Sequence, residues 1–397
     1  MADEKDNSEP EAPAPADTAD TPGDADTSQA AEAKAKPPLR KRALKIGLFC
    51  LYVLILLEVG SRAWWALKQD VPFFCAPEDF YCDFYPEVRE SGVLEAELGP
   101  DDGHYDVLML GGSAMQLFHV SMCHRNRHFQ DAVEPVVGRP VRAWNLARAA
   151  LTTRDSVIKY ERLGDLHFDL VIVYHGINDL RMNNVPPEKF EDDYTHAGWY
   201  VKVDRMMDYG GMLSAVTFPY TIEYAAIGIL DSRSVNHYVP RHAPNPEWQQ
   251  YAGEIRTARP FEANLRRIIS LAGRRGQPVV LGTFAWHIPE GYSMEKLQAG
   301  ELPYADSPEP SPIEIWGLVP HVAKGLRVHN GVTRRLGLAD RGEHTVLVAP
   351  VAERAGDEPE QFIDVCHLSA PGKQAMLGAL IETLRDNAGP LGLPDSP

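Results

Sequence analysis

The stretch DVLMLGGS, from Asp106 to Ser113, sets the architecture of this chain. Four apolar residues in a row, without polar alternation, are typical of a strand that is buried on both faces. Two glycines then permit a tight turn that exposes Ser113. A second stretch of this kind, FDLVIVYHGIND, runs from Phe168 to Asp179. In both stretches, polar residues directly follow a predicted buried strand.

Strand-like and helix-like segments alternate around these two stretches. Further strands are predicted at residues 141–144, 278–284 and 344–348, and helices at 154–163, 261–274 and 374–385. Buried strands between amphipathic helices predict an α/β fold with a doubly wound parallel sheet. Two long insertions interrupt the pattern, an aromatic-rich one at about 186–259 and a proline-rich one at about 287–316. The aromatic residues of the first insertion favour an ordered cap.

A polar tail and an apolar segment precede the alternating strands and helices. Residues 1–42 are acidic and then basic, with too few apolar side chains to fold, which predicts a disordered tail. Residues 43–67 are long and apolar enough for a transmembrane helix, with Trp64 and Trp65 placed as interfacial aromatics. Basic residues before the helix predict a cytoplasmic N-terminus and an extracytoplasmic body, on the periplasmic or cell-surface side.

Two alternatives to a membrane anchor stay open. Residues 46–57 match the apolar core of a cleaved signal peptide, and a buried helix of a soluble protein is the other alternative. Glu58 and Arg62 interrupt the apolar segment four residues apart, and we expect them to pair near its outer end. Residues 68–103 are expected to form an irregular stalk, and 104–390 the folded domain.

The net charge and the cysteines limit which ligands, metals and disulfides can be expected. The formal net charge of −17 argues against nucleic acid, whose phosphates require a basic surface. An extracytoplasmic body could form disulfides, and the pairing is left open among Cys75, Cys82, Cys123 and Cys366, with Cys75–Cys82 the easiest pair to close. Cys123, His124 and His128 have only partial metal-ligand spacing, so no metal and no cofactor are expected.

Reactive side chains are predicted to converge at one edge of the sheet. In an open α/β sheet, ligands bind beyond the carboxyl ends of the strands. Ser113 and Asn178 lie at two such ends, residues 145–153 follow a third, and Asp364 and His367 precede the last helix. This arrangement would bring a hydroxyl, an amide, a carboxylate and an imidazole together.

The same four segments carry a family resemblance. LMLGGSAM, WNLARAALTTRDS, GIND and DVCHL resemble, in order, the four blocks of SGNH (GDSL-type) serine hydrolases, whose fold is flavodoxin-like. The resemblance covers roughly residues 106–384. Gly112 stands where the family usually has Asp, as is common in its membrane-anchored bacterial members, and Ala150 stands where the family has Gly.

The resemblance implies a role for each matching residue. Ser113 would be the nucleophile, His367 the base that takes its proton, and Asp364 the group that orients the imidazole. The oxyanion hole would be built from the N–H groups of Ser113 and Ala150 and the side-chain amide of Asn178.

Plainer interpretations exist for these residues and their neighbours. Asn178 and Asp179 could be turn residues, and Asp364 and His367 could be capping and surface groups. Cys366 is interpreted as a packing residue or half of a disulfide. Ser369 followed by Pro371 predicts the start of the last helix.

The leading functional hypothesis is a serine esterase that hydrolyses O-acyl esters of a carbohydrate, a lipid or a cell-envelope glycan. One alternative is an O-acyltransferase that modifies an envelope polysaccharide, which would use the same acyl-enzyme. A third hypothesis is a non-catalytic envelope-binding protein on the same fold.

Overall fold

The structure is a computed structural model that describes residues 39–68, 71–74, 81–100, 102–164, 166–207, 216–233, 245–339 and 345–394. The expected tail at 1–42 therefore lies outside the described residues, except for its last four positions. The chain divides into two compact units, Met1–Ile55 and Leu56–Pro397, which are considered separately.

Five parallel strands form a single sheet in the order β2-β1-β3-β4-β5. Their bounds are β1 Tyr105–Gly111, β2 Val141–Asn145, β3 Leu170–Tyr174, β4 Val279–Gly282 and β5 Val346–Ala349. Every residue of β1, β3 and β4 is buried, as the apolar runs within these strands predict. The predicted doubly wound parallel sheet is confirmed.

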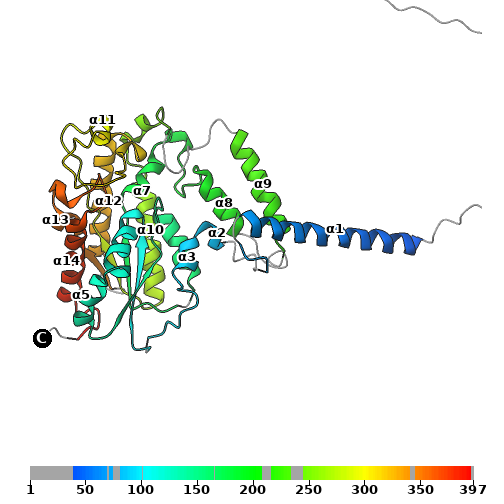
Figure 1. Cartoon of the computed structure of the whole chain (residues 1–397), viewed down its shortest axis with the longest axis horizontal. Helices are drawn as coiled ribbons and strands as arrows, with labels where there is room; N and C mark the ends of the chain where they lie inside the picture. Colours follow the sequence, from blue (N-terminus) through cyan, green and yellow to red (C-terminus); the bar gives the residue numbers. More distant parts are fainter. Residues whose placement is uncertain are drawn as a thin grey trace, which may run out of the picture. The chain divides into compact units, whose positions relative to one another are not determined.

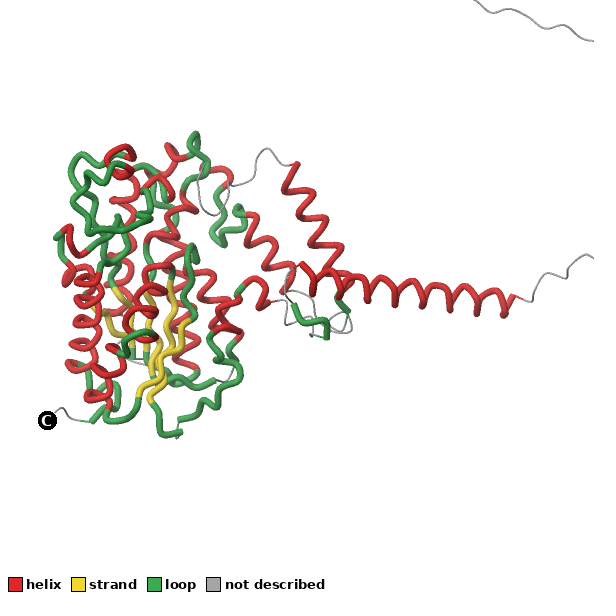
Figure 2. The backbone as a smooth tube through the Cα atoms, viewed as in Figure 1, coloured by secondary structure: helices red, strands yellow, loops and turns green. Residues whose placement is uncertain are grey.

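Helices cover both faces of this sheet (Figures 1 and 2). Val107 and Met109 of β1 belong to one core cluster, shared with α5 (His128–Val137) and α14 (Ala370–Asp386). Leu108 and Leu110 point the other way, into a second cluster shared with α6 (Thr153–Arg162) and α10 (Ala258–Arg274). Alternate residues of one strand thus supply both cores. The start predicted for the last helix is confirmed, because the Ser369 hydroxyl accepts from the Gly372 N–H.

Further helices and turns complete the described structure. The remaining α-helices are α2 Tyr81–Phe84, α3 Pro86–Glu90, α4 Ser113–His119, α7 Ile177–Leu180, α8 Gly198–Met207, α9 Phe218–Arg233, α11 Met294–Gln298, α12 Val319–Ala339 and α13 Val351–Ala355. A π-helical turn spans Val120–His124, and 3₁₀ turns span Arg181–Asn183, Pro187–Lys189, Gln249–Gly253, Ile313–Ile315 and Pro359–Gln361. The insertion at 186–259 thus contains α8 and α9, and that at 287–316 contains α11.

The N-terminal apolar segment forms α1, Leu39–Lys68. It is the one helix of the described residues that is long and apolar enough to cross a membrane. Its side chains from Leu44 to Leu57 are largely exposed, which suits a lipid environment. Near its end the environment changes, because Trp65 is only 1% exposed. Trp65 was expected at a membrane interface, and it lies instead in a protein core.

The segment expected to be a stalk differs from that expectation over its described residues. Val71, Tyr81, Tyr85 and Val88 are buried and share the second core cluster with Trp65 and β1. The Tyr85 hydroxyl also donates to Asp155 at the start of α6. Apolar side chains spaced between the acidic residues and prolines therefore attach this segment to the body.

Candidate active site

Ser113 is the first residue of α4 and directly follows β1. The turn from strand to helix is tight, because a side chain on Gly111 would collide with Met115 and with the Tyr174 carbonyl of the neighbouring strand. Gly112 is the N-cap residue of α4 and has an extended backbone. The two glycines thus place the Ser113 hydroxyl at the carboxyl edge of the sheet.

His367 and Asp364 come from the segment before α14 and meet Ser113 across 254 residues of chain. The His367 Nε2 lies 2.6 Å from the Ser113 Oγ, and its Nδ1 lies 2.7 Å from the Asp364 Oδ2. A carboxylate only accepts, so Nδ1 carries the proton and Nε2 accepts from the hydroxyl. These three predicted residues lie in one hydrogen-bonded chain.

Backbone groups hold the carboxylate of Asp364 in place. Its Oδ1 accepts from the N–H groups of Cys366 and His367, and its Oδ2 also accepts from the N–H of Ser311, each at 2.9 Å. Burial opposes ionisation, but the His367 contact and these N–H donors outweigh it, so the pKa of Asp364 is lowered. Asp364 therefore stays ionised beside the imidazole at neutral pH.

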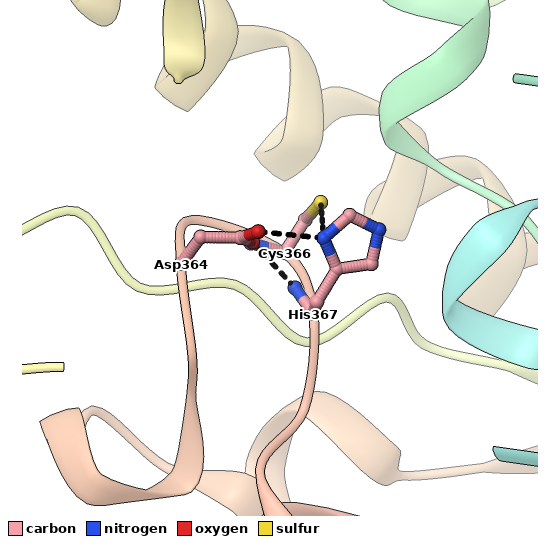
Figure 3. Close-up of side chains that lie close together, drawn as sticks. All are labelled: Asp364, Cys366 and His367. Carbon is pink, nitrogen blue, oxygen red and sulfur yellow. Dashed lines mark hydrogen bonds and ion pairs between the residues drawn. The ribbon is translucent and has the colours of Figure 1, made fainter. Parts of the chain in front are cut away.

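The thiol of Cys366 lies beside the imidazole of His367. Its Sγ lies 3.7 Å from the His367 Nδ1, on the side of the ring that faces Asp364 (Figure 3). Cys366 is a free thiol, so it is not half of a disulfide. Burial raises the pKa of this thiol well above its usual range. A neutral thiol facing an N–H group is a poor nucleophile, which favours packing as its role.

Asp364, Cys366 and His367 also have the donor types of a metal site, with one ligand atom from each within 4.8 Å of the others. The chemistry of the set does not fit a metal well. Asp364 already accepts four hydrogen bonds, and the thiol of Cys366 would have to ionise in a buried position.

Asn178 is the second residue of α7, which begins shortly after the end of β3, and its side chain has a fixed orientation. Its Oδ1 accepts from the Trp316 Nε1 at 3.1 Å, and its Nδ2 donates to the Leu151 carbonyl at 2.9 Å. Indole nitrogen only donates, so the amide oxygen must face Trp316. The amide nitrogen then packs against Gly112, where any side chain would collide with it. This contact explains why the residue before Ser113 is glycine.

Ala150 has the backbone conformation of a glycine position. Its φ is +68°, in the left-handed region that L-residues rarely adopt. The buried guanidinium of Arg181 donates to the Ala150 carbonyl. The chain therefore keeps the loop shape that the resemblance associates with Gly, and a charged hydrogen bond helps to hold it.

A buried polar network lies behind Asn178. Its neighbour Asp179 accepts from the N–H and hydroxyl of Thr153 and from the hydroxyl of Tyr194. Burial raises the pKa of Asp179 to about 6, against the effect of those donors. Asp155 accepts in the same way from Tyr200. Aromatic residues of the first insertion thus fasten it to the body as hydrogen-bond donors.

A cavity of about 420 Å³ lies in the second insertion. Its lining includes Tyr304, Pro310, Pro312 and Ile363. Pro310 and Pro312 flank Ser311, which holds Asp364, so the cavity adjoins the carboxylate end of the hydrogen-bonded chain.

Other residues singled out in the sequence lie apart from this site. Cys123 is a buried free thiol on the π-helical turn, where burial raises its pKa. The neighbouring His124 and His128 are exposed, in keeping with surface groups. Cys75 lies outside the described residues, so its expected pairing with Cys82 stays a prediction.

Comparison with known proteins gives the following. No protein-family model matches the chain, and no curated protein matches it. Among solved structures, it is similar to a GDSL-like lipase from Bacteroides thetaiotaomicron, at 11% identity and a TM-score of 0.41, covering 76% of this chain and 98% of that one. It is also similar to an acetylxylan esterase from Geobacillus stearothermophilus, at 13% identity and a TM-score of 0.31, with coverages of 70% and 94%. Because these TM-scores lie below 0.5, the chemistry proposed below rests on side-chain geometry alone.

Proposed function

We propose that the protein is a serine esterase that hydrolyses O-acyl esters, with Ser113, His367 and Asp364 as its triad. The observation that carries the proposal is the continuous hydrogen-bonded chain from the Ser113 hydroxyl through the imidazole to an ionised carboxylate. A serine hydroxyl is a weak nucleophile until a neighbouring base takes its proton. The substrate class is an ester of a carbohydrate, a lipid or an envelope glycan.

In the first half-reaction, the Ser113 Oγ attacks the ester carbonyl while His367 Nε2 accepts its proton. The tetrahedral intermediate carries a negative charge on the former carbonyl oxygen, which the N–H groups of Ser113 and Ala150 and the amide of Asn178 would stabilise. His367 then returns the proton to the departing alcohol, and Asp364 stabilises the imidazolium meanwhile. In the second half-reaction, His367 takes a proton from a water whose oxygen attacks the acyl carbon. The bond from that carbon to the Ser113 Oγ then breaks, and His367 returns the proton to the Oγ, which releases the carboxylic acid.

The test uses the full chain in detergent, with a short-chain aryl ester and a fluorophosphonate probe. We expect turnover of the ester and labelling at Ser113. Ser113→Ala should abolish labelling and lower kcat by about 10⁶-fold, the scale of nucleophile removal in other serine hydrolases. Ser270→Ala, which removes an exposed hydroxyl of α10, is the matched control and should change neither signal.

Two other outcomes would redirect the proposal. Labelling without ester turnover, with turnover restored by a sugar acceptor, would make the protein an O-acyltransferase. A folded protein that the probe does not label would leave a binding role on the same fold.

A further inference from the structure

α9 is an apolar helix with exposed side chains. Between Phe218 and Leu230, Glu223 is its only charged residue. Ile222 is 55% exposed, and Ala225 and Ala226 are exposed as well. A helix that is apolar around its circumference belongs in a protein core or in lipid. The exposed part of α9 therefore needs a cover that the described residues do not supply.

The N-terminus of α9 is fastened to the last turns of α1 (Figure 1). The Glu58 carboxylate accepts from the N–H groups of Thr217 and Phe218, at 2.8 and 3.0 Å. It also accepts from Arg62, its expected partner, at 2.6 Å. Glu58 thus receives the donors that a carboxylate needs in apolar surroundings, and the first turn of α9 receives a cap.

Hydroxyl groups and aromatic rings continue this contact. The Thr217 hydroxyl donates to the Ser61 hydroxyl at 2.9 Å, and the Trp65 Nε1 donates to the Thr221 hydroxyl at 2.9 Å. The ring of Tyr224 lies 5.1 Å from that of Trp65. Small hydroxyl residues that bond across two helices are typical of packing between helices in lipid.

The exposed surface of α1 indicates what covers α9. Leu56 and Leu57, the residues just before Glu58, are exposed and end the apolar part of a candidate membrane span. Trp64 and Phe74, which follow in the sequence, are exposed, and exposed aromatic side chains are typical of a membrane interface. The start of α9 is bound by Glu58, the residue that follows Leu57, so we expect a bilayer that covers Leu56 and Leu57 to reach the start of α9 as well.

We infer that α9 is a second membrane-contacting helix, which lies in the interface of the bilayer leaflet where α1 ends. Its sixteen residues give a length of about 24 Å, too short to cross a hydrocarbon core of about 30 Å. On this inference, the polar residues Glu58 and Ser61 of α1 bind the start of α9 and so hold α9 in the interface. The contact goes beyond the proposed esterase activity and does not depend on it.

The experiment places a benzophenone amino acid at position 222, and separately at 226, in the full chain. The purified protein is reconstituted in vesicles of phosphatidylcholine and phosphatidylglycerol with alkyne-tagged acyl chains, and irradiated. We expect lipid adducts at both positions. The matched control is position 318, an apolar leucine of the body that is similarly exposed, which should give no lipid adduct.

Each other outcome overturns the inference. An adduct between two copies of the chain would show that a second copy covers α9. Absence of any adduct at 222 and 226, in protein whose thermal unfolding matches the unsubstituted chain, would show that α9 stands in water. Equal lipid adducts at 222 and 318 would show contact that is not specific to α9.

Discussion

At the scale of single residues, the bond between Trp316 and Asn178 determines which end of the amide faces Gly112, the residue before Ser113. Trp316→Phe removes the Nε1 donor and keeps an aromatic ring, so the amide loses its fixed orientation. A hydrogen bond is worth about 1 kcal/mol, and we expect kcat to fall about fivefold with little change in KM. Asn178→Ala should cost more, about 10²–10³ in kcat, because the donor itself is lost. Steady-state kinetics of both variants measure these effects. Full turnover by Trp316→Phe would refute the role of Trp316 in orienting the Asn178 amide.

Asp179 should make the stability of the protein depend on pH. Its pKa is near 3.8 when unfolded and about 6 when folded, so between these values the folded chain holds a proton that the unfolded chain has released. The free energy of unfolding should therefore fall as the pH rises through 6. One pKa unit is worth about 1.4 kcal/mol, which gives about 3 kcal/mol in all.

To test this, the free energy of unfolding of the natural chain and of Asp179→Asn is measured by denaturant unfolding from pH 4 to pH 7. The substitution also disturbs hydrogen bonds to Thr153, but that cost does not vary with pH. The stability of the natural chain relative to the variant should drop over this range. A constant difference would contradict the raised pKa.

Sequence patterns could predict some of these residues and not others. Ser113, Asn178, Asp364 and His367 each follow or precede a recognisable element, so their meeting could be anticipated. Trp316 acts on Asn178 from 138 residues away, with no local signal beyond the end of a proline-rich insertion. Ser311 contributes its backbone N–H, which any residue type except proline would supply.

At the scale of elements, the buried strands were predictable because unbroken apolar runs have few other interpretations. The helix α12 was not, because Gly325, Gly331 and Gly337 lower its helical propensity. The structure gives a packing reason for two of them. A side chain on Gly325 would collide with Leu180, and one on Gly337 with Val348 of β5. Tertiary contact thus overrides propensity.

Two of the glycines of α12, Gly331 and Gly337, allow a matched test. Gly337→Ala should destabilise the protein by about 1–3 kcal/mol, because the added methyl overpacks against β5. Gly331→Ala should instead stabilise it by up to about 1 kcal/mol, since the nearest atom would be the Arg335 guanidinium at 3.7 Å and alanine favours the helix. Thermal unfolding of both variants checks the sign, and equal shifts would contradict the packing argument.

At the scale of the whole molecule, the last turns of α1 contribute Trp65 to a hydrophobic core of the body. Trp65→Ala in the full chain should cost about 3–5 kcal/mol of body stability, the usual cost of removing a buried aromatic side chain. Its neighbour Trp64 is 36% exposed, so Trp64→Ala is the control and should cost much less. Thermal unfolding in detergent measures both. Similar losses would mean that Trp65 is not part of the folded core.

The burial of Trp65 implies that the body depends on α1 for its stability. A body that lost α1 would lose this indole from the cluster that it shares with Val71, Tyr85 and Tyr220. The first turn of α9 would also lose the Glu58 carboxylate that accepts its N–H groups. A fragment without α1 would expose the apolar side chains that Trp65 covers, so we expect it to aggregate or to be degraded.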